Sequence, residues 1–183
     1  MSYDHSVSVQ LSVINPAQDA DELVRFLSSN RFPFHVIERP SDVEARSRVT
    51  NGVFDPPDSL AYWIDFAGNR VGFLNFQEIS DGTPMIDLRL GEAHRGRGLG
   101  SVALELGVAE TFNSNPDVNR VEGNTRADNI AMRKVFQRTG FVKEAHYREG
   151  WTVADSAPLD SVAYAILRRD WRTGASTPID WDA

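Results

Sequence analysis

The chain has 183 residues, a formal net charge of -7 at pH 7 and no cysteine, with 41% hydrophobic and 25% charged residues, which is the composition of one ordinary globular domain. The absence of cysteine excludes disulfides, thiolate metal sites and a cysteine nucleophile, and the acidic balance argues against a general nucleic-acid binder. Residues 1–10 lack the pattern of a secretory signal, and no stretch approaches the ~20 apolar residues that span a bilayer. We therefore expect a cytoplasmic protein with neither a membrane nor a nucleic-acid partner.

The N-terminal part carries strand, helix and then irregular signals. Residues 7–13 have valine or leucine at every second position, which predicts a half-buried strand. Asn15 followed by Pro16 is a helix N-cap with proline at the first helical position, so a helix is expected next. Residues 30–59 show no clear period apart from a possible short helix near Ser41. A connection of this length predicts a functional flap or the wall of a binding site.

An antiparallel meander follows. Strands are expected at 60–67 and 70–79, joined by Gly68 and Asn69 in a tight hairpin, and Asp81-Gly82 marks a second hairpin into a strand at 85–90. A glycine-rich turn then leads into a helix at 99–113, and the pattern continues with a strand at 120–125, a helix at 129–138 and strands at 141–147 and 161–167. The apolar stripe of the first of these two helices is predicted to be Leu99, Val102, Ala103, Leu106, Ala109 and Phe112.

This order of elements predicts an α/β (α+β) fold. We expect one domain over residues 1–172, with a mixed, mostly antiparallel sheet, a central βαβ crossover and flanking helices, followed by a polar tail at 173–183. Edge strands of such a sheet make a homodimer possible.

The segment from His94 to Ser101 carries the strongest chemical signal. It places three glycines between a strand and a helix, so the backbone can approach a ligand closely while unpaired N–H groups at the helix start point towards it. Arg95 and Arg97 add local positive charge, which suits a pyrophosphate. From this segment alone, a glycine turn with two solvated arginines is the alternative interpretation.

A dinucleotide site is a competing interpretation of the same turn. Gly98, Gly100 and Ala103 also satisfy the pattern G-x-G-x-x-G/A, and Glu122 lies on the next strand near the expected ribose position. However, that turn usually opens its domain, whereas here an antiparallel meander precedes it and too little chain follows for a second mononucleotide half. Nicotinamide binding is therefore the weaker hypothesis.

Arg95, Gly98 and Gly100 match the acetyl-CoA signature of the GNAT superfamily of N-acetyltransferases, which is Arg or Gln, two residues, Gly, one residue, and Gly or Ala. Downstream, the helix that begins at Asn129 and ends before Gly140-Phe141 is similar to the family's Asn-led helix. The resemblance covers about residues 85–147. Residues 141–147 and 160–167 look most like the branch that acetylates the N-terminal α-amines of ribosomal proteins.

The resemblance implies acetyl-CoA as cosubstrate and no metal. Its pyrophosphate is expected on the turn, and its pantetheine arm along the preceding strand, so that the thioester lies between two parted parallel strands and is attacked directly by a neutral amine. The N–H of Leu90 is the expected oxyanion donor. Asn129 is equally well explained as a helix cap. The expected cofactor contacts are Leu88, Arg89, Leu90, Arg95, Gly96, Arg97, Gly98, Leu99, Gly100, Ser101, Asn129, Arg133 and Phe136.

The sequence departs from the family at the catalytic acid. Many members have Tyr seven residues after the Asn, and the ribosomal-protein branch often has Ser three residues after it, but these positions are Phe136 and Met132 here. For the base, the candidates are Glu149, Asp87 and Glu122. Asp87 falls on the same strand face as Arg89, which allows a mutual ion pair and makes a poorer base. Glu149 lies where similar enzymes place an acidic residue, and Glu122 has Arg120 as a possible partner.

Taken together, the sequence predicts an acetyl-CoA-dependent N-acetyltransferase that acts on a primary amine of unknown identity, such as a small amine, an antibiotic or a protein N-terminus. A non-catalytic CoA-binding regulatory module is the alternative, because the usual acids are missing. The four histidines are scattered with no pair at metal-binding spacing, so no metal is expected.

Overall fold

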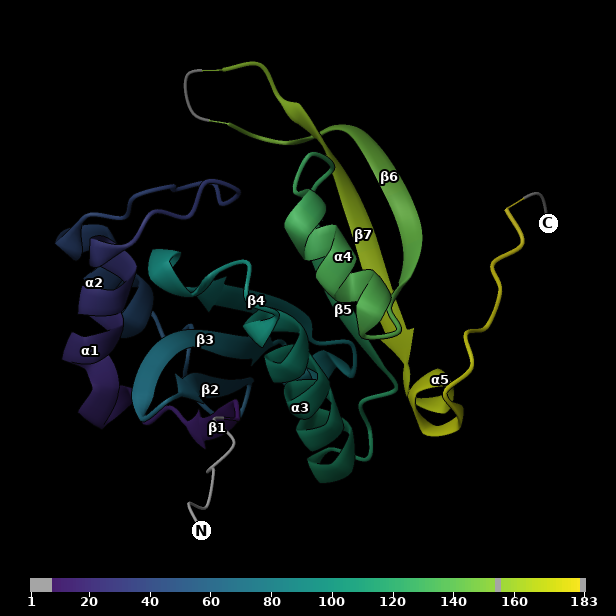
Figure 1. The fold of residues 1–183 in the computed structure, drawn as a ribbon, viewed down its shortest axis with the longest axis horizontal. Coiled ribbons are helices and arrows are strands. Elements are labelled where there is room, and N and C mark those ends of the chain that lie inside the picture. The colour runs from purple at the N-terminus through teal and green to yellow at the C-terminus, as the bar shows by residue number, and fades with distance from the viewer. Residues whose placement is uncertain (1–7, 154–155, 182–183) are drawn as a thin grey trace, which may run out of the picture.

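A seven-stranded sheet with helices on both faces forms the centre of the protein (Figure 1). The computed structural model describes residues 8–153 and 156–181. In spatial order the strands are β1 (Gln10–Val13), β2 (Ser59–Phe66), β3 (Asn69–Gln77), β4 (Met85–Leu90), β5 (Arg120–Arg126), β7 (Leu159–Leu167) and β6 (Val142–Trp151). The helices are α1 (Pro16–Ser29), α2 (Asp42–Thr50), α3 (Leu99–Ser114), α4 (Ile130–Arg138) and α5 (Arg168–Thr173).

Among the described strands, β4 and β5 form the one parallel pair, and every other pair is antiparallel. The unit β4-α3-β5 is the expected βαβ crossover, so the predicted mixed α/β fold is confirmed. One core lies between the sheet and α3 and α4, and a second lies under α1 and α2. The two faces of the sheet are therefore covered by different helices, α3 and α4 on one face and α1 and α2 on the other.

The helix starts follow the local sequence as expected. Asn15 Oδ1 accepts from the Ala17 amide at 3.1 Å, and Pro16 opens α1. Ser41 and Glu44 form a capping box at the start of α2, which confirms the short helix expected near Ser41. Asn129 caps α4 by accepting from the Met132 amide at 3.2 Å.

Several boundaries differ from the expectation. The hairpin between β2 and β3 turns at Ala67 and Gly68 rather than Gly68 and Asn69, because Ala67 and Gly68 both have positive φ and Asn69 begins β3. Of the valines on the predicted buried face of the first strand, Val7 lies outside the described residues, and Val13 is 74% exposed instead of buried. The final helix α5 was missed because it starts directly after β7 with no turn residue between them.

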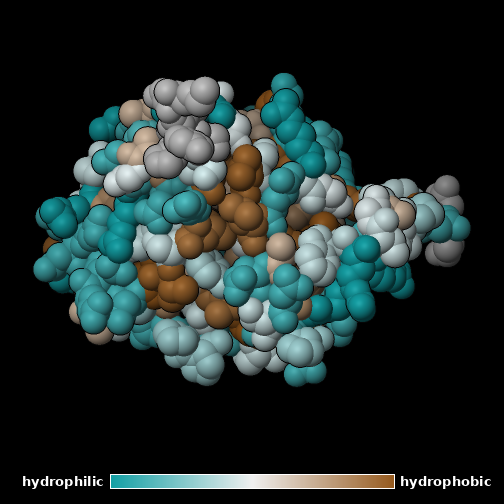
Figure 2. Space-filling model, turned by 60° about the horizontal axis from the view of Figure 1, so that its bottom comes forward, coloured by the Kyte–Doolittle hydropathy of each residue, from teal (hydrophilic) through white to brown (hydrophobic). Residues whose placement is uncertain are grey.

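The predicted apolar stripe of α3 is wrong at two positions. Val102 and Leu106 are more than 40% exposed, whereas Leu104, Gly107, Val108 and Thr111 are buried. The helix has apolar residues around most of its circumference, so periodicity alone does not identify the inner face, and the small Gly107 lets α3 approach Leu74 and Phe76 of β3 closely. Figure 2 shows that apolar side chains gather on one face of the molecule. The exposed large hydrophobic residues include Val13 of β1 and Val102 and Leu106 of α3.

No helix among the described residues is long and apolar enough to cross a bilayer.

Candidate active site between two parting strands

The strands β4 and β5 separate after a single paired position. Within the described residues their register holds only Met85 opposite Glu122, and the Glu122 amide donates to the Pro84 carbonyl at 2.9 Å. On the other side, β4 keeps its full pairing with β3 up to Leu90. The second half of β4 therefore has one strand neighbour and one open edge.

The hydrogen-bond register shows which backbone groups face this opening. The Gly91 amide donates to the Val71 carbonyl at 2.9 Å, so Leu90 opposite Gly72 is a pair that exchanges no hydrogen bonds. By the alternation of an antiparallel ladder, the N–H and C=O groups of Leu88 and Leu90 point away from β3 and towards the gap. The Leu90 carbonyl accepts from Arg95 Nε at 2.9 Å, which leaves the Leu90 N–H and both Leu88 groups without a strand partner in the described part of the chain.

The glycine turn forms a concave backbone surface beside this edge. Gly96 and Gly98 have φ values of +72° and +80°, and a Cβ at either position would meet no atom within 4 Å. The amide N–H groups of residues 96–100 have no acceptor in the described part of the chain, as expected for the first turn of α3 and the loop before it. Unpaired amides at a helix start, open to solvent, form a site for an anion.

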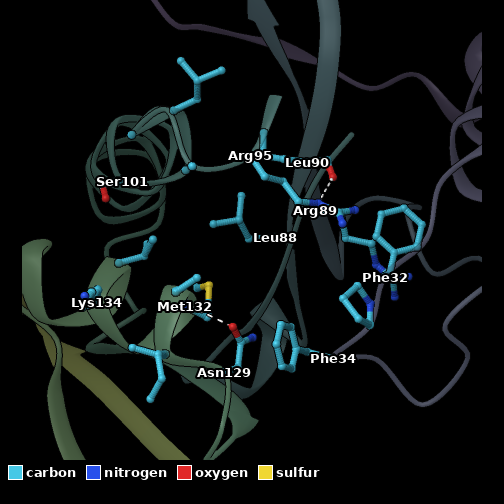
Figure 3. A pocket seen from close by; sticks show the side chains of 18 of the residues that line it. Phe32, Phe34, Leu88, Arg89, Leu90, Arg95, Ser101, Asn129, Met132 and Lys134 are labelled. Carbon is cyan, nitrogen blue, oxygen red and sulfur yellow. Dashed lines mark hydrogen bonds between the residues drawn. The ribbon is translucent and has the colours of Figure 1, made fainter. Parts of the chain in front are cut away.

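One cavity of about 570 Å³ joins the turn to the β4 edge (Figure 3). Its walls include the turn and the start of α3, residues 88–90, the start of α4 and the segment 32–35. Of the thirteen cofactor contacts expected from the sequence, ten line it: Leu88, Arg89, Leu90, Arg95, Gly96, Gly98, Leu99, Gly100, Ser101 and Asn129. Phe32 and Phe34 also line it, so the irregular segment lies where a binding-site wall is required.

The two arginines of the turn do not extend freely into the cavity. Arg95 donates to the Leu90 carbonyl and, through Nη2, to the Arg31 carbonyl at 2.5 Å, and its guanidinium lies 5.5 Å from the Phe32 ring centre. Arg97 lies over Phe66 at 5.0 Å and is not among the lining residues. Arg95 therefore links the turn, the end of β4 and the aromatic wall, while Lys134 and Arg138 of α4 line the cavity as cations that the sequence reasoning did not select.

Two expected contacts on α4 lie outside the cavity wall. Phe136 is buried and stacks on Tyr164 with ring centres 4.9 Å apart, and Arg133 Nη1 donates to the Ala127 carbonyl at 2.8 Å. Asn129 accepts from the Met132 amide and donates to Thr125 Oγ1 at 2.9 Å, so its capping role is confirmed while its side chain still borders the cavity. Met132 lines the cavity and has no proton to give.

A second cavity, of about 440 Å³, adjoins the first on the face of the sheet covered by α1 and α2. His35 and Arg89 line both cavities, so the two meet at these side chains. The alternation of β4 explains the division, because Leu88 and Leu90 lie against Gly100 of α3 while Asp87 and Arg89 point to the opposite face.

Asp87 is held by two arginines. It lies 2.6 Å from Arg48 Nη2 and 3.0 Å from Arg89 Nε. Burial alone raises the pKa of Asp87, but the charges of Arg89, His35 and Arg48 outweigh it and keep that pKa well below its usual value. The expected ion pair with Arg89 is therefore present, and Asp87 is a poor proton acceptor.

The other two candidate bases are placed differently. Glu122 Oε1 accepts from Arg120 Nε at 2.6 Å, as the sequence allowed, and Glu122 lines neither cavity. Glu149 is exposed on β6, has φ of +55°, and lies two residues before Trp151, which lines the second cavity. The structure does not bring the three carboxylates together.

His35 is the titratable side chain that the sequence reasoning passed over. Burial, together with Arg89, Arg48 and Arg95, lowers its pKa to about 4, although Asp87 acts in the opposite direction. The imidazole is therefore neutral at pH 7, at the junction of the cavities. Its neighbours come from three separate segments, so no local sequence signal marks it. Among the described residues, no group of three or more His, Asp or Glu side chains is arranged to hold a metal ion.

The structure thus places two parting parallel strands beside a glycine turn with unpaired amides, in a mixed α/β domain. A Rossmann domain is excluded, because its sheet is mostly parallel and this one has a single parallel pair among its described strands. Residues 10–142 match the family model described as "Acetyltransferase (GNAT) domain". The chain belongs to the GNAT acetyltransferase family.

Solved structures share the same fold at low sequence identity. A spermidine N-acetyltransferase chimera of Vibrio cholerae SpeG and hSSAT is 15% identical, with a TM-score of 0.74 over 90% of this chain and 98% of its own. RimL, a ribosomal L7/L12 α-N-protein acetyltransferase solved with coenzyme A, is 20% identical, with a TM-score of 0.70 over 88% and 95%. The microcin C7 self-immunity acetyltransferase MccE, solved with acetyl-CoA and AMP, is 18% identical, with a TM-score of 0.71 over 87% and 92%. At these identities the likeness establishes the fold.

Proposed function

We propose that this protein is an acetyl-CoA-dependent N-acetyltransferase that transfers the acetyl group directly to a primary amine. One observation carries the proposal: the open edge of β4 and the amides of the glycine turn line the same cavity. A ligand that combines a diphosphate with an amide-containing arm needs these two features at one site.

The residues present fit acetyl-CoA. The amides of residues 96–100 are unpaired, and no other atom lies within 4 Å of where a Cβ would stand at Gly96 or Gly98, which leaves room for a diphosphate to approach the backbone. Leu88 offers one N–H and one C=O along the strand edge, which suits the amides of the pantetheine arm. When bound there, acetyl-CoA supplies an activated acetyl thioester. The N–H of Leu90 faces the same gap and is our proposed donor to the oxyanion that forms during attack.

The surroundings of the reacting amine favour its neutral form. His35 and Arg89 lie where the two cavities meet, and Arg95 lines the first of them. The same burial and arginine charges that lower the pKa of His35 would also lower the pKa of an amine bound beside it. An amine attacks only when its lone pair is free, so this environment supports direct transfer.

Proton transfer uses groups that this chain keeps accessible. We propose that exposed Glu149 takes the amine proton through water, because Asp87 and Glu122 are each held by arginine. Phe136 and Met132 have no proton to donate, so the departing thiolate is protonated by water.

The test is a binding titration with CoA followed by a turnover assay. We expect CoA to bind, and free thiol to appear when acetyl-CoA is mixed with an acceptable amine, with an acetylated product of matching mass. Absence of CoA binding would overturn the proposal. Binding without turnover across a broad amine panel would favour the non-catalytic module.

A further inference from the structure

The second cavity has apolar walls and a polar part in which Asp87 is already paired with arginine. Its apolar side chains include Leu27, Ile37, Met85 and Trp151. Asp87 is paired with Arg48 and Arg89. The carboxylate of Glu44 accepts from both the amide and the hydroxyl of Ser41, at 2.8 Å each. Of the two carboxylates at this cavity, Asp87 is therefore paired with two guanidinium groups, and Glu44 is held at the exposed start of α2.

Two hydrogen-bond donors at the same cavity have no acceptor. Arg48 Nε and Gln77 Nε2 are buried atoms without a hydrogen-bond partner in the described part of the chain, and both residues line the second cavity. A buried donor left unpaired is costly, and such groups are few in folded proteins. Both unpaired atoms are donors, so the ligand group that completes them is an acceptor.

The charges of the side chains that line this cavity balance, because Arg48 and Arg89 stand against Asp87 and Glu44. The preference for an acceptor group therefore comes from the two unpaired donors and not from a net charge of the cavity. One of these donors belongs to a guanidinium, which makes a stronger hydrogen bond to a carboxylate than to a neutral acceptor.

Resting on the proposed function, we infer that the acceptor substrate is a primary amine that also carries a carboxylate, and that Arg48 Nε and Gln77 Nε2 donate to its oxygens. The amine then lies at the junction marked by His35 and Arg89, and an apolar side chain of the substrate lies among the apolar walls. This assigns the second cavity to an amino-acid-like acceptor rather than to a polyamine.

The test compares three acceptors that share an amine and an isobutyl side chain and differ in the carboxyl group: leucine, leucinamide and 3-methylbutylamine, which lacks it. The variants are Gln77→Met and Arg48→Met. Arg46→Met is the control, since Arg46 lies on the same helix, pairs with Asp21 at the surface and lines neither cavity. Each cavity variant should lower the ratio of kcat/KM for leucine to that for 3-methylbutylamine by about 10- to 100-fold, the usual loss for a hydrogen bond to a charged group. The control should leave it within about twofold.

Comparing this ratio between variants removes the effect of each amine's intrinsic pKa, because every variant is tested with the same amines. Leucinamide has a neutral carbonyl where leucine has a carboxylate. Arg48→Met should therefore lower kcat/KM more for leucine than for leucinamide. Gln77→Glu replaces the donor by a negative acceptor and should reverse the preference towards 3-methylbutylamine. Unfolding midpoints identify any variant that is not folded, and the conclusion then rests on the other position.

The inference is overturned if the cavity variants lower kcat/KM equally for all three acceptors, if leucinamide loses as much as leucine in Arg48→Met, or if the wild-type protein prefers spermidine to leucine. If no amine is acetylated, the proposed function fails, and calorimetric binding decides the inference separately. In that case, leucine must bind the CoA-loaded wild-type protein at least tenfold more tightly than 3-methylbutylamine does; equal or absent binding overturns it.

Discussion

Adding a methyl group at Gly98 tests the glycine turn as a diphosphate site. Gly98 has φ of +80°, and a Cβ there meets no atom within 4 Å, so Gly98→Ala clashes with nothing in the protein itself. The left-handed backbone costs an L-residue roughly 1–2 kcal/mol, which is the expected fall in the free energy of unfolding. The new methyl group, however, occupies the cavity beside the unpaired amides.

Gly174→Ala is the matched control. Gly174 has φ of +71°, its Cβ would also meet open space, and it follows α5 outside both cavities. The two variants should therefore lose similar stability. Only Gly98→Ala should lose CoA affinity, by about 1.5–3 kcal/mol if one charge-assisted hydrogen bond is lost, which is roughly 10- to 150-fold in Kd.

Calorimetric titration with CoA measures the affinities, and urea unfolding measures the stabilities. A fold-change in Kd of less than about two in Gly98→Ala, alongside normal folding, would refute the assignment of this turn to the diphosphate. Equal weakening in both variants would refute it as well, because the effect would then come from backbone strain alone.

Three further outcomes are expected. The pKa of His35 is lowered from 6.5 to about 4 in the folded state, so the unfolded chain binds the proton more tightly between these pH values. The free energy of unfolding should therefore be highest above pH 6.5 and should fall by about 3 kcal/mol as the pH is lowered to 4. Urea unfolding across this range should show that slope, and the contribution of His35 should be absent in His35→Gln. Phe136→Tyr should not raise kcat, and should lower the free energy of unfolding by about 1–3 kcal/mol, because the tip of the Phe136 ring lies against Gly123 in the core; a faster enzyme would contradict this. Arg95→Met removes the donors to Leu90 and Arg31 and should lower both stability, by about 1–3 kcal/mol, and CoA affinity; unchanged values in the same two assays would show that this link is unimportant.

The parts of the fold that sequence predicts well are those whose signals are local. The caps at Asn15, Ser41 and Asn129 each depend on a side chain and an amide two or three residues away, so the chain itself encodes them. The glycine turn is equally local, because glycine adopts the positive φ seen at Gly96 and Gly98 more readily than any other residue.

Features that depend on contacts between distant segments could not be predicted in this way. The inner face of α3 is set by its contact with β3, where Leu74 and Phe76 leave no room for a side chain at Gly107. Arg95 is part of the turn signature, yet its guanidinium binds carbonyls of Leu90 and Arg31, the latter far away in sequence. The sequence identifies the arginine at this position, but it does not show to which carbonyls the guanidinium donates.

The overall charge of the chain was also a poor guide to the site. A net charge of -7, together with carboxylates on the central strands, suggests a binding site for cationic amines. Folding brings Arg48 of α2 across to Asp87, and Arg89 lies beside them, so this carboxylate is paired with two guanidinium groups and is not left for a cationic amine. What the site attracts is decided by which charges are left unpaired, and pairing is a property of the tertiary structure.

Strand β4 is one short segment that lines both cavities. Its even-numbered residues Leu88 and Leu90 face α3 and the cofactor side, and its odd-numbered residues Asp87 and Arg89 face α2 and the second cavity. Its backbone lies between the two and presents its free groups to the gap where β5 has parted. Because a strand alternates by geometry alone, a change on one face leaves the other face and the backbone donors in place. If the proposed function holds, such a construction lets residues on the acceptor face change without moving the backbone groups proposed to hold the thioester.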